Sequence, residues 1–92
     1  MLQGLQPQKQ SELLPSAAEI WQLAKAKGSY EEMVQVLKDN ADMLRGYNSF
    51  RNDPKLEAEI QKLEKILSKC EEKNSAKMPL DKLIAAVEEE FF

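Results

Sequence analysis

Residues 53–70 read DPKLEAEIQKLEKILSKC, and this stretch decides the fold class. Asp53 and Pro54 predict a helix start, because a capping carboxylate precedes a proline at the first helical position. Apolar side chains then recur at alternating spacings of four and three, as in a heptad seam: Leu56, Ile60, Leu63, Leu67 and Cys70. A seam of only two repeats predicts a helix near 54–73 that pairs in an antiparallel hairpin within a bundle.

The preceding segment carries its own helix signals. Ser29 followed by Glu32 is typical of a capping box, and Gly46 suits the left-handed turn after a helix end. These signals predict a helix near 30–45 and a loop over 47–52. The predicted core-facing stripe consists of Tyr30, Met33, Val34, Leu37, Ala41 and Leu44.

Two further helices are predicted outside this hairpin. Ser16 and Glu19 form a second capping-box pattern, so we expect a helix near 16–27 that ends before Gly28. Its inward stripe is predicted to be Ile20, Leu23 and Ala24, with Ala17 and Trp21 at the edge. The last helix, near 80–91, has a stripe of Leu80, Leu83, Ile84, Val87 and Phe91. We therefore expect an all-α bundle of about four short amphipathic helices, one domain over 16–92, after a flexible arm over 1–15.

Composition excludes several function classes. The 92 residues include no histidine and one cysteine, so no pattern matches a metal site or acid–base catalysis near neutral pH. There is also no glycine-rich phosphate loop. We expect no enzyme activity, no cofactor and no bound metal. The lone Cys70 cannot form an internal disulfide, and no secretory signal or membrane-spanning run occurs, so we expect a cytoplasmic protein that does not contact membranes.

The segment 20–37 resembles the helix-turn-helix of repressors. Ala24, Gly28, Val34 and Leu37 occupy the four positions typical of that motif. The resemblance implies a small DNA-binding regulator, but Ser29 stands where an apolar residue is usual. The would-be recognition helix also opens with two glutamates, and the net charge is −3, both of which disfavour phosphate contacts. We therefore prefer a plain helical hairpin and keep DNA binding as the alternative function.

Charge is separated along the third predicted helix. One flank carries lysines and another carries glutamates at intervals of seven: Lys55, Lys62, Lys65, Lys69 and Lys73 on the first, Glu57, Glu64 and Glu71 on the second. The flanks are either simply solvated or, on the basic side, a strip for an acidic partner such as the Glu88-Glu89-Glu90 run of a neighbouring copy.

Four other features bear on function. Val36 and Met43 lie seven residues apart, well over 100° from the main stripe of their helix, so that helix either packs on two sides or presents a second strip. Trp21 at a stripe edge is a typical interface residue, and Phe92 ends an acidic run that either frays or docks. We predict a non-enzymatic protein–protein interaction module (adaptor, inhibitor, chaperone or assembly subunit) whose partner is another protein or a second copy. The candidate contact residues are Trp21, Val36, Met43, Lys62, Lys69 and Phe92.

Overall fold

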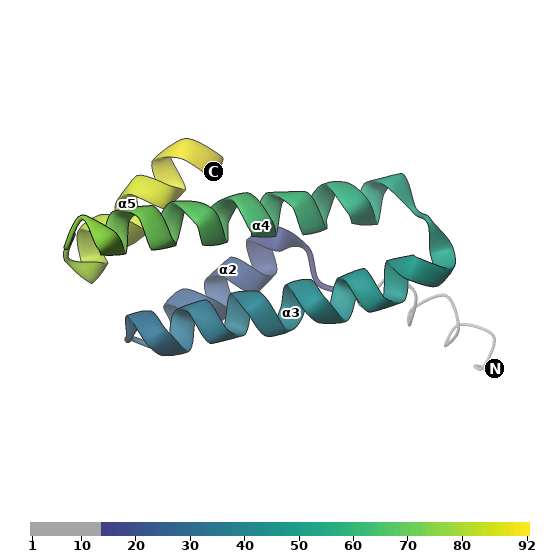
Figure 1. Cartoon of the computed structure of the whole chain (residues 1–92), viewed down its shortest axis with the longest axis horizontal. Coiled ribbons are helices and arrows are strands. Elements are labelled where there is room, and N and C mark those ends of the chain that lie inside the picture. The colour runs from purple at the N-terminus through teal and green to yellow at the C-terminus, as the bar shows by residue number, and fades with distance from the viewer. Residues whose placement is uncertain (1–13) are drawn as a thin grey trace, which may run out of the picture.

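The computed structural model describes residues 14–92, which form four helices and no strand (Figure 1). The helices are α2 (Ala17–Lys25), α3 (Tyr30–Arg51), α4 (Pro54–Ser75) and α5 (Leu80–Phe91). α3 and α4 form a long antiparallel hairpin; α2 packs on α3 and also reaches α4, and α5 packs on α4. The predicted all-α bundle is confirmed. The predicted arm lies outside the described residues except for Leu14, which packs on the core, and Pro15.

Three of the predicted helix starts have side-chain caps. The Ser16 hydroxyl accepts from the amide of Glu19 at 3.2 Å, and the Glu19 carboxylate accepts from the amide of Ser16 at 2.9 Å. Ser29 accepts from the amide of Glu32 at 3.2 Å, whereas the Glu32 carboxylate accepts from the Ser29 hydroxyl at 3.3 Å and not from the Ser29 amide, so only half of the predicted capping box forms. At α4, the Asp53 carboxylate accepts from the amide of Lys55 at 2.9 Å. Each of these paired amides has no partner within its own helix, so these short polar signals set where the helices begin.

The predicted end of the second helix is wrong. α3 runs through Gly46 and ends at Arg51, where Asn52 takes the left-handed conformation with φ of 52°. The amide of Asn52 donates to the carbonyl of Asn48 at 2.9 Å and closes the last turn. A glycine in a helix interior costs only about 1 kcal/mol, which contacts made by the added turns offset. Tyr47 and Phe50, predicted to lie in a loop, are therefore helical.

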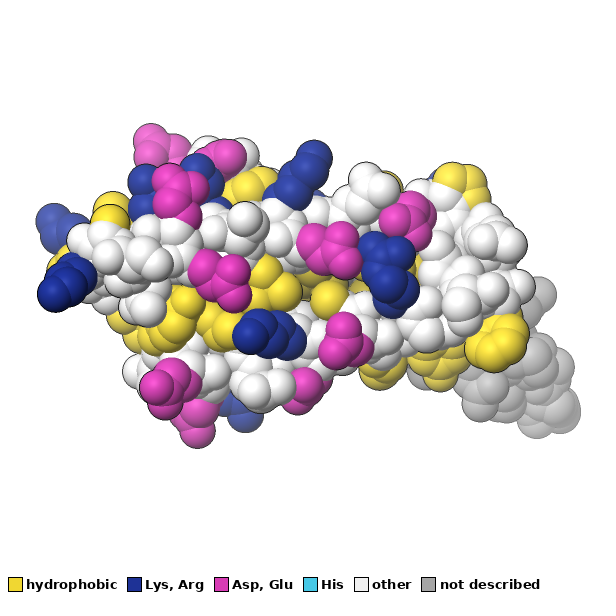
Figure 2. Space-filling model, in the orientation of Figure 1, with side chains coloured by type: hydrophobic (Ala, Val, Ile, Leu, Met, Phe, Trp, Pro, Cys, Tyr) yellow, Lys and Arg dark blue, Asp and Glu magenta, His cyan; other side chains and the backbone are white. Residues whose placement is uncertain are grey.

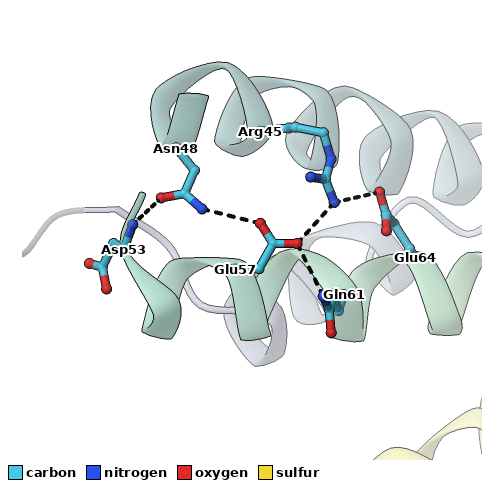
Figure 3. A network of polar contacts seen from close by, with 6 residues as sticks. All are labelled: Arg45, Asn48, Asp53, Glu57, Gln61 and Glu64. Atoms are coloured by element: carbon cyan, nitrogen blue, oxygen red, sulfur yellow. Dashed lines mark hydrogen bonds and ion pairs between the residues drawn. The ribbon is translucent and has the colours of Figure 1, made fainter. Parts of the chain in front are cut away.

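Polar contacts join the two long helices near their connection (Figure 3). The side-chain oxygen of Asn48 accepts from the amide of Asp53 at 2.7 Å, and its nitrogen donates to Glu57 at 3.2 Å. The Glu57 carboxylate also accepts from Gln61 at 3.1 Å and lies 3.5 Å from the Arg45 guanidinium. The Gln61 hydrogen bond, then Arg45 and Asn48, lower the pKa of Glu57. Asn48 is buried with both ends of its amide paired, which explains the extended α3.

All four helices contribute to one apolar core. Its fully buried side chains include large residues from every helix: Ile20, Trp21, Met33, Leu37, Leu44, Ile60, Leu63, Ile66, Leu83 and Val87. On α3 the predicted stripe is buried, with Tyr30 half-buried. Leu56, Ile60, Leu63 and Cys70 of the α4 seam are buried as well.

The packing departs from the predicted faces at two places. On α2, Leu23 is 59% exposed and Trp21 only 1% exposed, so the buried face is rotated toward Trp21. On α4, Ile66 is buried and Leu67 only half-buried. Both shifts have one cause: α2 and α4 each contact more than one neighbour, so their buried faces are centred between two contacts and not on a single seam.

The connection between α2 and α3 depends on Gly28, whose φ of 80° lies in the region that favours glycine. Within residues 14–92, none of the helices has the length and apolarity that crossing a bilayer requires.

Candidate functional site

The six candidate contact residues fall into two groups. Trp21, Lys62, Lys69 and Phe92 contact the end of α5 or belong to it, inside the chain. Val36 and Met43 lie apart from them on α3, where Val36 is half-buried against the core and Met43 is exposed.

The first group holds the end of α5 against α2. The rings of Trp21 and Phe92 stack with centroids 6.2 Å apart and planes 17° from parallel. The indole nitrogen of Trp21 donates to the Glu88 carboxylate at 3.0 Å, and the Lys25 ammonium pairs with the same oxygen. The hydrogen bond from Lys25, followed by that from Trp21, lowers the pKa of Glu88. A buried indole thus has both its ring face and its donor occupied within the chain.

The lysine flank of α4 completes this group. The Lys62 ammonium lies 4.4 Å from the centroid of the Phe92 ring, a cation–π contact. The Lys69 ammonium lies 2.9 Å from Glu90 and 3.7 Å from Glu72, and the hydrogen bond to Glu90 is the main reason that the pKa of Lys69 is raised. The basic flank and the acidic terminus, which the sequence offered as complementary surfaces of two copies, here meet within one chain. We call these contacts the C-terminal clasp.

The second group belongs to a row on the outer side of α3 that is apolar except for Asn40. We call it the outer stripe, and its members recur at spacings of four and three: Val36, Asn40, Met43, Tyr47 and Phe50. The row lies about 110° around the helix from the core-facing stripe. Met43 is 42%, Tyr47 49% and Phe50 89% exposed. Figure 2 shows hydrophobic side chains along the edge of the C-terminal half of α3 that faces away from α4.

A hollow lies on the C-terminal half of the outer stripe. It has a volume of about 420 Å³ and is lined by Asp42, Met43, Gly46, Tyr47 and Phe50. Four of these, Met43, Gly46, Tyr47 and Phe50, stand at i, i+3, i+4 and i+7, the set that forms a hole for a side chain of a facing helix. A methyl group on Gly46 would meet nothing within 4 Å, so packing inside the chain does not require glycine there.

A second hollow lies at the N-terminal half of the outer stripe, between α2 and α3. It has a volume of about 440 Å³ and is lined by Leu23, Ala26, Lys27, Val36 and Asn40. Leu23, predicted to lie in the core, forms part of this wall. The outer stripe therefore has a hollow near each end.

Sequence reasoning found Val36 and Met43 but missed Tyr47, Phe50 and Leu23. The first two were lost because Gly46 was interpreted as a helix end. One signal could have found them: the spacing of four and three that begins at Val36 continues through Gly46 to Phe50 without a break.

The described residues offer few other side chains that could bind a metal or react. No group of three or more potential metal-ligating side chains occurs among residues 14–92. Cys70 is fully buried, and burial raises the pKa of its thiol to about 11. Three residues of the helix-turn-helix resemblance, Ala24, Val34 and Leu37, are buried in the core, a role they would have in any helical hairpin. What the arrangement offers is an apolar surface for non-covalent contact.

No protein-family model matches the chain, and no curated protein or solved structure shows significant similarity to it.

Proposed function

We propose that this chain is a non-enzymatic protein–protein interaction module that binds an α-helix along its outer stripe. One observation carries the proposal: Phe50 is 89% exposed and stands in line with the exposed side chains of Met43 and Tyr47. Isolated exposed apolar residues are ordinary, whereas a continuous apolar row marks a surface that another molecule covers.

The shape of the outer stripe favours a helical ligand. From Val36 to Phe50 it extends over four turns, about 21 Å. The hole around Gly46 is spaced for a side chain of a facing helix, and a groove of this kind accepts apolar anchors at i, i+3 or i+4 and i+7. The exposed carboxylates of Asp39 and Asp42 make no ion pair within residues 14–92 and supply a polar rim.

The partner is another protein or a second copy of this chain. A module that binds a partner without catalysing a reaction acts as an adaptor, an inhibitor, a chaperone or an assembly subunit. We place that work in the cytoplasm, since a lone cysteine with a buried, protonated thiol fits a reducing compartment.

Affinity capture with matched variants tests the proposal. The immobilised chain is incubated with nuclease-treated lysate, so that capture through nucleic acid is removed. Phe50→Asp places a charge in the outer stripe, and Ser68→Asp places the same charge on an exposed position of α4. We expect proteins that the wild type and Ser68→Asp retain and Phe50→Asp loses. A captured set that is the same for all three baits would contradict binding at the outer stripe.

A further inference from the structure

The two end residues of the outer stripe lie at equal distances from Met43. Val36 and Phe50 lie seven residues to either side, about 10.5 Å along the helix. Asn40 and Gly46 lie three residues to either side of the same centre. A second helix laid antiparallel on this face, with Met43 against Met43, would thus bring the two ends of one row against the opposite ends of the other.

The two ends of the outer stripe have complementary shapes. At one end the ring of Phe50 stands 89% exposed. At the other end lies the hollow of about 440 Å³ between α2 and α3, walled by Leu23, Ala26 and Val36. This hollow exceeds the volume of a phenyl ring, and the side chain of Lys27 at its edge would bring a cation to that ring. A projecting aromatic and a hollow that accepts it thus lie at equal distances from one centre on the same surface.

We propose that two copies of this chain pair antiparallel along their outer stripes, with Phe50 of each copy seated in the hollow between α2 and α3 of the other. This inference rests on the proposed function, because it names the occupant of the same surface. A two-fold axis through Met43 makes the contact isologous, so one patch serves both copies and the assembly closes at a dimer.

The polar members of the face agree with this pairing. Asp39 would face Gly46 of the other copy, where no Cβ obstructs a close approach. The side-chain nitrogen of Asn40 already donates to the carbonyl of Val36 at 2.8 Å, so burial does not leave that donor unpaired. Asn40 would face Tyr47 of the other copy, whose hydroxyl can donate to the side-chain oxygen of Asn40.

The strength of the dimer follows from its size and charge. A contact of four helical turns is small, and small interfaces are weak and transient. Each copy carries a net charge of −3, so electrostatic repulsion between copies opposes pairing and added salt screens it. We expect a dimer that forms with increasing protein concentration and is favoured by higher ionic strength.

The first test measures mass against concentration by light scattering after size exclusion. The wild type should approach twice the monomer mass as concentration rises. Phe50→Asp and Gly46→Leu should remain monomeric, because the first places a charge at the projecting position and the second fills the hole around Gly46. Both positions are exposed, so both variants should fold, which circular dichroism verifies. Ser68→Asp should dimerise like the wild type.

The second test reads the register by disulfide cross-linking. A Met43→Cys protein should form a covalent dimer on mild oxidation, because equivalent residues meet at the axis. A mixture of Val36→Cys and Phe50→Cys should form mixed dimers, and Val36→Cys alone should not cross-link. Native Cys70 is buried and serves as the unreactive background.

The possible outcomes of these tests distinguish the antiparallel pairing from the proposed function. A wild type that stays monomeric at every concentration, a dimer that survives Phe50→Asp, or cross-linking of Val36→Cys to itself would overturn the antiparallel pairing. A monomeric wild type that still captures foreign proteins through Phe50 would remove this inference and leave the proposed function standing. A stripe-dependent dimer that captures nothing else supports the inference and makes self-assembly the whole of the function.

Discussion

The indole nitrogen of Trp21 donates a hydrogen bond of 3.0 Å to the carboxylate of Glu88 and so ties α2 to the last turns of α5. The acidic end of α5 lies at the negative end of its helix dipole, an unfavourable position. Lys25 and Lys69, from two other helices, pair with Glu88 and Glu90 and offset that repulsion. The end of α5 is thus stabilised by tertiary contacts that its own sequence does not contain.

Replacing Glu88 by glutamine should reduce stability at pH 7 and change its dependence on pH. The pKa of Glu88 is lower in the folded chain than in the unfolded one, so its stabilising contribution is present above the unfolded pKa and is lost as the pH falls through the folded pKa. The carboxylate is about one-third exposed, so we expect a loss of about 0.5–1 kcal/mol at pH 7. Urea unfolding at pH 7 and pH 3 should show that this difference narrows in acid. Glu89→Gln, at an exposed position, is the control, and equal pH dependence in both variants would contradict the role of Glu88.

Removing the Phe92 ring should expose the sole tryptophan. Phe92 covers one face of the Trp21 indole, and Lys62 in turn lies over Phe92. In Phe92→Ala we expect the emission of Trp21 to shift to longer wavelength and its quenching by acrylamide to increase. Phe50→Ala deletes an equal ring away from the clasp and should leave both signals unchanged in dilute protein. Unchanged emission in Phe92→Ala would show that the clasp does not hold in solution.

Alanine at two glycines should have opposite effects on the free energy of unfolding. Gly46 is helical with open space around it, so Gly46→Ala should stabilise the monomer by about 0.5–1 kcal/mol. Gly28 has a φ of 80°, so Gly28→Ala should destabilise it by about 1 kcal/mol. Chemical denaturation of dilute protein measures both. If Gly46→Ala proved destabilising, residues 47–51 would not continue α3 as described.

Cys70 should be unreactive in the folded protein. Its side chain is fully buried and burial raises its pKa to about 11, so little thiolate forms at pH 8 and reagents cannot reach it. We expect a chromogenic disulfide reagent to label Cys70 slowly in native protein and rapidly in concentrated guanidinium. Native labelling should accelerate in variants that destabilise the fold, such as Gly28→Ala. Equal rates in native and denatured protein would contradict the placement of Cys70 in the core.

Part of the candidate binding surface could be predicted from the sequence and part could not. Val36 and Met43 were recognised because they lie off the core stripe of their helix, a property of the helical wheel alone. Leu23 was predicted to be buried and is exposed, whereas Trp21 was predicted to lie at the edge and is buried. A helical wheel does not show where two neighbouring helices contact the helix. Lys69 of the lysine flank pairs with Glu90 of the same chain, and this contact depends on the return of α5 along α4.

The sequence by itself determined the helical class, the three side-chain-capped helix starts and most of the core, because capping side chains and apolar spacing act over a few residues. The tertiary structure alone decided where α3 ends, which face of α2 is buried and what the C-terminal clasp contacts. Each of these depends on residues distant in the chain: Asn48 reaches Asp53 and Glu57, and Trp21 reaches Glu88 and Phe92. The outer stripe depends on both the sequence and the tertiary structure. The sequence sets the spacing of its residues, but their exposure follows from how the other helices cover the remaining faces of α3.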